Sequence, residues 1–186
     1  MGWLSRTTLE KMGFRALGRD VMVSEKCSIY EPHNISIGDY SRIDDFCVIS
    51  GTVTLGRNVH IAVQCNLAGG EPGITMDDFA GLAYGVQVFA QSDDYSGKHL
   101  TNPTVPDIYK VESKKPVHLS RHVIIGANSV IMPGVHIAEG CSVGALSLVN
   151  RSTEPWGIYV GAPARRVKER SDRLLALEDA YRKSDP

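Results

Sequence analysis

The sequence predicts an all-β protein built as a parallel β-helix, and two repeating patterns of apolar residues support this fold class. In the first pattern, an aliphatic side chain returns every sixth position in two blocks separated by a long break. A period of six matches neither the 3.6-residue period of a helix nor the simple alternation of a lone strand. It is typical of a coil in which each short strand turns one aliphatic side chain inward. The first block contains Ile37, Ile43, Ile49, Leu55, Ile61, Leu67, Met76, Leu82 and Val88, and the second contains Leu119, Ile125, Ile131, Ile137, Val143 and Val149.

A second pattern accompanies the first, because a small or β-branched residue stands four positions after the aliphatic one. Such residues fit an inward position near a corner, where a large side chain would collide with the neighbouring coils. A sandwich of separate strands would instead show alternation and turn signals at a spacing of about 8–12 residues. These positions are Ser41, Cys47, Val53, Val59, Cys65, Ala80, Val86, Ser92, Val123, Ser129, Val135, Cys141 and Ser147.

A short helix is expected before the coil. Residues 5–13 carry a possible capping box in Thr7 and Glu10, and Leu9 and Met12 offer apolar contacts. The length of 186 residues fits a single domain over residues 1–186, large enough for a sizeable core.

The coil itself is expected over residues 23–154, with two interruptions that leave it at one corner. The first is a three-residue slip at residues 70–73, and the second is an insertion at residues 93–116. Loops of that length inside compact domains are usually functional, so the insertion predicts one wall of a pocket. Residues 168–183 predict a second helix that covers an open end of the coil or packs on a neighbouring subunit.

Composition excludes several classes of partner. The formal net charge of −1 gives no overall field to attract nucleic acid or an anionic membrane. No apolar stretch approaches the roughly 20 residues that span a bilayer, and the N-terminus lacks a signal-peptide pattern. The cysteines form no CxxC pair and occupy the small inward positions, which favours reduced core thiols and a cytoplasmic location.

Two alanines mark an outward column along the coil. If three hexads make one turn, Ala127 and Ala145 stack vertically, each preceded by a glycine, Gly126 and Gly144. Small outward side chains leave backbone N–H and C=O groups open to a long, thin ligand. Tight packing between subunits is the alternative explanation of the same column.

With its hexads, its interrupting loop and the segments at residues 123–135 and 161–165, the chain resembles the hexapeptide-repeat acyltransferases. It is similar to the galactoside and maltose O-acetyltransferases and to nucleotide-amino-sugar acetyltransferases associated with surface-polysaccharide synthesis. The resemblance covers nearly the whole chain. It implies a left-handed β-helix, an exception to the usual right-handed crossover, and a homotrimer that binds acetyl-CoA in a cleft between neighbouring subunits.

The resemblance also implies where acetyl-CoA would lie. The column of Ala127 and Ala145 corresponds to the wall that holds the pantetheine arm, and basic residues near the end of the coil correspond to the phosphate site, where charge-assisted hydrogen bonds are strong. The implied contacts are Gly126, Ala127, Gly144, Ala145, Asn150 near the adenine, and Arg165 and Lys168 near the phosphates.

The chain departs from the O-acetyltransferases where the acceptor is activated. In those enzymes a histidine opens the inserted loop and serves as the base, whereas Asp93 stands here. Asp93 and the following Asp94 are the candidate catalytic carboxylates, and Tyr95 is expected to shape the acceptor site. A carboxylate, with an ordinary pKa of about 4, is a poor base toward a hydroxyl group. It can orient an ammonium group or accept a proton from an amine, which favours an amino-sugar acceptor, while O-acylation and N-acylation both stay open.

A histidine can enter the site from another part of the coil. His60 faces outward and is followed by Gln64 and Asn66, and Gln64 matches a side-chain amide that orients the acceptor in the resembling enzymes. His60 and Asp93 belong to different corners of one chain. Across a trimer interface they could meet, and Asp93 would then polarise the imidazole of His60.

Two other classes of protein compete with the acyltransferase. A γ-type carbonic anhydrase shares the β-helix and the trimer but needs three histidines on zinc, and His60 has no histidine close by. His118 and His122 are four residues apart, which on a coil places them on different parts of a corner, so no metal is expected. A non-catalytic scaffold would have no need of an alanine column beside basic residues.

Overall fold

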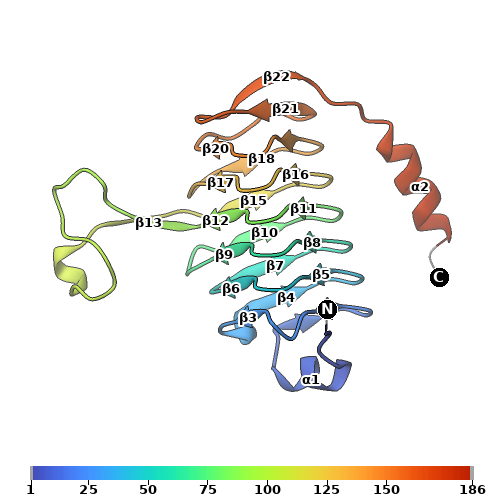
Figure 1. The fold of residues 1–186 in the computed structure, drawn as a ribbon, viewed down its shortest axis with the longest axis horizontal. Helices are drawn as coiled ribbons and strands as arrows, with labels where there is room; N and C mark the ends of the chain where they lie inside the picture. The colour runs from blue at the N-terminus through green and yellow to red at the C-terminus, as the bar shows by residue number, and fades with distance from the viewer. Residues whose placement is uncertain (1, 185–186) are drawn as a thin grey trace.

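The computed structural model describes residues 2–184 and shows three parallel β-sheets that wind around one apolar core (Figure 1). Successive strands pass from the first face to the second and then to the third, so strands of consecutive coils lie directly above one another. The parallel β-helix predicted from the six-residue period is therefore confirmed, although regular pairing begins earlier than residue 23.

The first face contains β1 (Ala16–Leu17), β4 (Ile35–Ile37), β7 (Val53–Leu55), β10 (Ile74–Met76), β15 (Val117–Leu119) and β18 (His136–Ile137). The second face contains β2 (Met22–Val23), β5 (Arg42–Ile43), β8 (His60–Ile61), β11 (Gly81–Leu82), β16 (Ile124–Ile125), β19 (Ser142–Val143), β21 (Gly157–Val160) and β22 (Arg165–Glu169). The third face contains β3 (Ser28–Ile29), β6 (Val48–Ser50), β9 (Asn66–Ala68), β12 (Gln87–Phe89), β17 (Val130–Ile131) and β20 (Leu148–Val149).

The aliphatic residues of the hexads fill the core as expected. Ile43 and Ile61 of the second face are fully buried, as are Ile49 and Leu67 of the third. Members of the second pattern, such as Ser41, are equally buried near the corners. Because the same interior position recurs in every coil, each inward side chain packs on those directly above and below it.

The helix α1 (Arg6–Lys11) lies at the start of the coil and buries Leu9 against it. Its N-cap is Ser5, whose hydroxyl accepts a hydrogen bond from the Thr8 N–H at 3.1 Å. The expected capping box of Thr7 and Glu10 is wrong, because Ser5 and not Thr7 is the N-cap. The helix covers Arg6–Lys11 and is therefore shorter than the expected residues 5–13. A 3-10 helix, η1 (Pro32–Asn34), precedes β4.

An arm leaves the coil between the third and first faces, at what we call the arm corner. Its stalk is the antiparallel pair β13 (Gln91–Asp93) and β14 (Glu112–Lys114), and its outer part contains the 3-10 helix η2 (Asp107–Tyr109). Figure 1 shows the arm projecting well away from the coil. A Cβ atom on Gly70 would lie 2.3 Å from the side-chain oxygen of Gln91, so the slip at residues 70–73 and the arm share one corner, as predicted.

The C-terminal region differs from the expected helix over residues 168–183. Arg165–Glu169 form β22, which pairs antiparallel with β21 and covers the last open strand edge. The helix α2 therefore begins only at Leu174 and ends at Ser184. Within residues 2–184, no helix is both long enough and apolar enough to cross a membrane.

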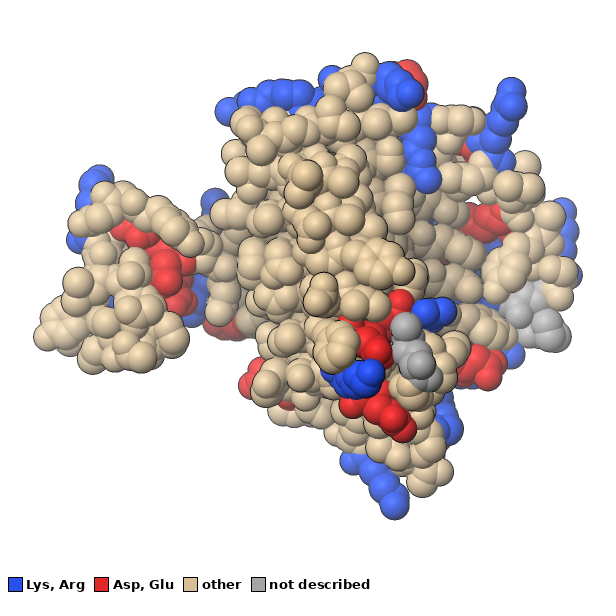
Figure 2. Space-filling model, in the orientation of Figure 1, with Lys and Arg blue, Asp and Glu red and all other residues tan. Residues whose placement is uncertain are grey.

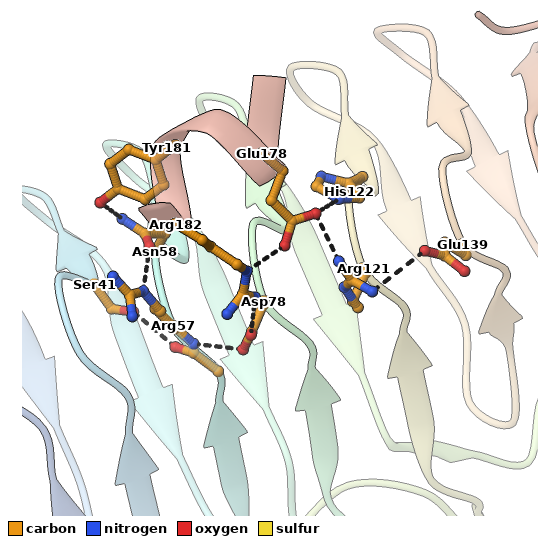
Figure 3. A network of polar contacts seen from close by, with 11 residues as sticks. Ser41, Arg57, Asn58, Asp78, Arg121, His122, Glu139, Glu178, Tyr181 and Arg182 are labelled. Carbon is orange, nitrogen blue, oxygen red and sulfur yellow. Dashed lines mark hydrogen bonds and ion pairs between the residues drawn. The ribbon is translucent and has the colours of Figure 1, made fainter. Parts of the chain in front are cut away.

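The helix α2 does not cover an end of the coil. It runs beside the corner between the first and second faces of its own coil, which we call the helix corner (Figure 1). Its buried side chain is a carboxylate rather than an apolar group. Glu178 accepts hydrogen bonds at 2.6 Å from Arg121, from His122 and from Arg182 of the same helix (Figure 3). Arg182 also bonds Asp78 of the coil at 2.9 Å.

Burial alone would raise the pKa of Glu178, but the hydrogen bonds from Arg182 and His122 and the charge of Arg121 hold it below the ordinary value. A carboxylate with a lowered pKa in the folded state stabilises that state above its unfolded pKa, and this stabilisation is lost as the pH falls through the folded pKa. The docking of α2 is therefore strongest at neutral pH.

Leu67→Ala tests the core. Because Leu67 is 0% exposed, we expect the free energy of unfolding to fall by about 2–5 kcal/mol. The matched change Leu177→Ala removes a side chain that is 71% exposed and should alter it by less than about 0.5 kcal/mol. Urea unfolding followed by circular dichroism at one protein concentration measures both, and equal losses would contradict the assignment of the core.

Glu178→Gln tests the attachment of α2. Loss of the charge weakens three hydrogen bonds from charged donors, so amide hydrogens of residues 174–184 should exchange at least about tenfold faster at pH 7. Wild-type α2 should show the same acceleration only as the pH falls below the ordinary glutamate range. The exposed neighbour change Asp179→Asn is the control, and unchanged exchange in Glu178→Gln would refute this role.

Candidate active site

The corner between the second and third faces, which we call the alanine corner, carries unused backbone donors. Ala127 and Ala145 follow one another in consecutive coils, and the Leu146 N–H donates to the Ala127 carbonyl at 2.9 Å. Among residues 2–184, the N–H groups of Ala127 and Ala145 have no hydrogen-bond partner. Ala127 is half-buried and Ala145 is exposed, so both donors are accessible to a ligand or to a neighbouring chain.

Two coils of the helix corner show how a side chain can close such a donor. At the equivalent position of two coils, the Arg19 N–H donates to Asp39 and the Arg57 N–H donates to Asp78, each at 2.9 Å. Each carboxylate comes from the next coil and closes the corner. In the coils of Ala127 and Ala145, alanine stands at this position, so no side chain of the coil reaches the two N–H groups.

Gly126 is required by the close spacing of coils at the alanine corner. A Cβ atom on Gly126 would lie 2.4 Å from the backbone nitrogen of Ala145. Any side chain there would push the two coils apart and displace both donors.

A small basic hollow of about 180 Å³ lies at the end of the coil, between the segment that follows β20 and the start of β22. Arg151, Arg165 and Arg166 line it together with Ser152 and Tyr159. Figure 2 shows Lys and Arg side chains gathered over this end of the molecule. Arg151 was not predicted as a phosphate-binding residue, although it directly follows Asn150 in the sequence.

The other residues expected near the phosphates and the adenine are all exposed. Asn150 follows the last strand of the third face, and Lys168 lies on β22 opposite Ile158, outside the lining of the hollow. Arg166 bonds Glu169 at 2.8 Å, so it also helps to hold β22 in place.

The arm and the third face enclose a cavity of about 480 Å³. Asp93 and Tyr95 of the arm line it, opposite Phe89, Val130 and Met132 of the coil. The arm thus places two carboxylates, Asp93 and Glu112, and the ring of Tyr95 beside an apolar wall, which suits a ring-shaped ligand with a polar substituent.

The two consecutive aspartates of the arm have different partners. Asp93 accepts the Asn102 N–H at 3.3 Å and lies in the cavity lining. Asp94 accepts hydrogen bonds from His99 at 2.7 Å and from the backbone and hydroxyl of Ser96, and these bonds lower its pKa to about 2. Asp94 is therefore occupied in shaping the arm, whereas Asp93 is positioned to meet a ligand.

His60 lies on the second face, one residue before the buried Ile61 and close to the alanine corner. Its Nε2 atom is 3.0 Å from Asp44, whose other oxygen accepts the Arg42 Nε–H at 2.6 Å. Within one chain the structure does not bring His60 to Asp93. The sequence alone gave no sign that Asp44 is the partner of His60.

Of the three residues expected to bind an acceptor, Tyr95 lines the arm cavity, whereas Gln64 and Asn66 lie beyond His60 and outside its lining. Gln64 stands exposed at the alanine corner with a φ of 63°, and Asn66 lies on the third face beside Gln87. Neither lines the cavity that contains Asp93 and Tyr95.

The histidines that suggested a metal have other partners. His118 bonds Asp77 at 2.8 Å and stacks on His136, while His122 bonds Glu178. In the part of the chain that the structure describes, no group of three or more His, Cys, Asp or Glu residues is arranged to hold a metal ion.

The fold and these three adjoining features, an open corner, a basic hollow and a projecting arm, define a parallel β-helical protein of hexapeptide repeats. A family model described as bacterial transferase hexapeptide (six repeats) matches residues 116–151. Over 187 aligned residues the chain is 38% identical to a dTDP-4-amino-4,6-dideoxy-D-glucose acyltransferase of Escherichia coli, covering 99% of this chain and 97% of that one.

Two solved structures of AntD, an N-acyltransferase from Bacillus cereus, are similar along the whole chain. One contains dTDP and 3-hydroxybutyryl-CoA and superimposes with a TM-score of 0.97, 48% identity, and coverage of 98% of this chain and 97% of that one. A variant in complex with dTDP-4-amino-4,6-dideoxyglucose and coenzyme A gives 0.98, 48% identity and 99% of each chain. The chain belongs to the hexapeptide-repeat acyltransferase family, and its coil is the left-handed β-helix of that family.

Proposed function

We propose that this acyltransferase moves an acyl group from acyl-CoA to the amine of a dTDP-linked 4-amino-4,6-dideoxy sugar. The likeness to the Escherichia coli enzyme and to AntD along the whole chain, arm included, is the observation that carries this proposal. AntD was solved with 3-hydroxybutyryl-CoA, so the donor class is acyl-CoA and not necessarily acetyl-CoA. A role in surface-polysaccharide synthesis and a cytoplasmic location stay predictions from the sequence.

The alanine corner supports a place for the pantetheine arm. The unpaired N–H groups of Ala127 and Ala145 lie in consecutive coils, and Gly126 and Gly144 keep the wall beside them flat. Pantetheine is long and thin and carries amide carbonyls that can accept from these donors. The basic hollow with Arg151 and Arg165 lies at the end of the coil, and its charge suits the phosphates of CoA.

The arm supports a place for the acceptor. Asp93 can accept a hydrogen bond from the sugar amine or ammonium, and Tyr95 can cover one side of the sugar. A carboxylate orients an amine better than it activates a hydroxyl group, so the arm favours N-acylation over O-acylation. Gln64 and Asn66 are proposed to hold other parts of the acceptor near the alanine corner.

Assembly of three copies would complete this site. Tyr95 is 90% exposed and Ile108 is 83% exposed on the arm, which is a large apolar surface for a segment that projects from its own coil. The arm of one copy can cover these side chains by lying on the next copy. The acceptor cavity of one chain would then adjoin the alanine corner of its neighbour.

The chemical step is attack of the neutral amine on the thioester carbonyl carbon. The C–N bond forms, the C–S bond breaks, and CoA leaves as a thiolate that gains a proton. Backbone N–H groups at the alanine corner are available to stabilise the oxyanion that forms during attack. No metal or further cofactor takes part in the proposed reaction.

An assay of purified protein tests the proposed function directly. We expect dTDP-4-amino-4,6-dideoxyglucose with acetyl-CoA or 3-hydroxybutyryl-CoA to release free thiol, and mass spectrometry to show an amide product. dTDP-6-deoxyglucose, which differs only by a hydroxyl group in place of the amine at C4, is the matched control and should not react. Transfer to dTDP-6-deoxyglucose at an equal rate would contradict N-acylation, and no transfer with either donor would refute the proposal.

Asp93→Asn should lower kcat/KM for the amino sugar by roughly ten- to hundredfold, because a hydrogen bond to a charged group contributes about 1.5–3 kcal/mol. Binding of CoA, measured by calorimetry, should not change. Asp179→Asn, an exposed change on α2, is the control. Full activity of Asp93→Asn would show that Asp93 does not bind the acceptor.

Ala145→Leu should raise the KM for acyl-CoA by about tenfold or more, because the added side chain covers the Ala127 and Ala145 N–H groups. The same substitution at the exposed Ala176 of α2 should leave KM within about twofold. An unchanged KM in Ala145→Leu would show that acyl-CoA does not bind along Ala127 and Ala145.

A further inference from the structure

A buried carboxylate on the second face has no part in the fold's core or in the arm. The Asp44 side chain is only 4% exposed, although it stands at the surface end of β5, just before the alanine corner. Both of its oxygens are engaged: Oδ1 accepts the Arg42 Nε–H at 2.6 Å, and Oδ2 lies 3.0 Å from His60 Nε2. Burial opposes its ionisation, yet the bonds from Arg42 and His60 hold the pKa of Asp44 below its ordinary value.

This contact determines which nitrogen of His60 carries the proton in the neutral ring. An ionised carboxylate only accepts hydrogen bonds, so the Nε2 atom must donate to Asp44. The lone pair of the neutral imidazole is then on Nδ1. Within residues 2–184, Nδ1 has no hydrogen-bond partner, and the His60 side chain is 49% exposed.

Arg42 and Trp3 keep the carboxylate of Asp44 in one orientation. Arg42 and His60 are direct neighbours in the β5–β8 pair, so both reach the same aspartate from adjacent coils. The guanidinium of Arg42 lies 5.1 Å from the centre of the Trp3 ring, which covers it from the N-terminal side. Rotation of the Asp44 carboxylate would break both hydrogen bonds at once.

We propose that Asp44 is a positioning residue that fixes the tautomer and orientation of His60, and that His60 Nδ1 takes the proton released by the attacking amine. This inference rests on the proposed acyl transfer. As the C–N bond forms and the C–S bond breaks, the excess proton of the amine passes to Nδ1 and then to the sulfur of the departing CoA. Asp44 stays ionised throughout and stabilises the imidazolium, as the aspartate does in Asp–His pairs of other acyl-transfer enzymes.

The location of His60 agrees with this role. It lies beside the alanine corner, where the thioester end of a donor laid along Ala127 and Ala145 would arrive, and four residues before Gln64. Asp93 then has the separate task of orienting the acceptor, so the two carboxylates are assigned to different steps.

Asp44→Asn is the sharpest test, because it keeps the shape of the side chain. Arg42 still requires an oxygen, so the new amide presents its NH2 group to His60 Nε2, and the ring must carry its proton on Nδ1 instead. We expect kcat for the amino sugar to fall by roughly 10²-fold or more with KM for both substrates within about twofold. ¹⁵N NMR of the histidine rings should show His60 changing from the Nε2–H to the Nδ1–H tautomer.

Two further variants complete the experiment. His60→Gln should lose as much activity as Asp44→Asn, and the double variant should lose no more than the worse of the two, because the pair acts as a unit. Asp77→Asn is the matched control, since Asp77 bonds His118 Nε2 at 2.8 Å on the first face in a similar Asp–His contact. It should leave kcat within about twofold.

The outcomes separate this inference from the proposed function. Full activity of His60→Gln, or of Asp44→Asn with its tautomer changed, would overturn the role of His60 while leaving acyl transfer in place. A fall in kcat without a change of tautomer would reduce Asp44 to a structural residue and also overturn the inference. Failure of wild-type protein to acylate any dTDP-amino sugar would overturn the proposed function itself, and the inference with it.

Discussion

The direct stacking of each strand on the strand of the preceding coil is the constraint on which the rest of this structure depends. It requires one aliphatic side chain per hexad in the interior and a small residue near each corner, as Ile61 and Cys65 show. The same stacking brings backbones so close that Gly126 has no room for a Cβ atom beside Ala145. A column built in this way is rigid and its faces are uniform, so chemistry can enter only at the corners and at interruptions of the repeat.

The three corners share one backbone geometry but have different surroundings. At the helix corner, Asp39 and Asp78 satisfy the free N–H groups, and α2 then covers the surface through Glu178. At the arm corner the chain leaves the coil and returns through the antiparallel stalk. In the coils of Ala127 and Ala145, neither a carboxylate nor a helix of the described chain closes the alanine corner, and the two donors stay open. The side chain at this one position therefore decides, coil by coil, whether the corner is closed by the protein itself.

The parts of the structure that depend on local repetition could be predicted from the sequence, and the parts that depend on contacts between coils could not. The period of six located the core, the arm and the alanine column because each hexad has the same role in every coil. The start of α2 was predicted six residues too early, since nothing local shows that Arg165–Glu169 pair with the edge of β21. The partner of His60 was also missed: Asp44 lies sixteen residues earlier, and only the register of β5 on β8 places the two side chains together. Asp93 and Asp94 look alike in sequence, and only the fold of the arm gives them different partners.

In the proposed function, the rigidity of the coil also explains why one chain is insufficient. His60 lies on the second face near the alanine corner, whereas Asp93 lies on an arm that leaves from the arm corner across the third face. A column whose interior is fully packed cannot bend to bring these corners together. The arm, however, extends outward and exposes apolar side chains such as Ile108, which gain stability when another copy covers them. Burial of these side chains would hold the copies together. It would also bring Asp93 of one chain to His60 of the next, so assembly and completion of the site would have one physical cause.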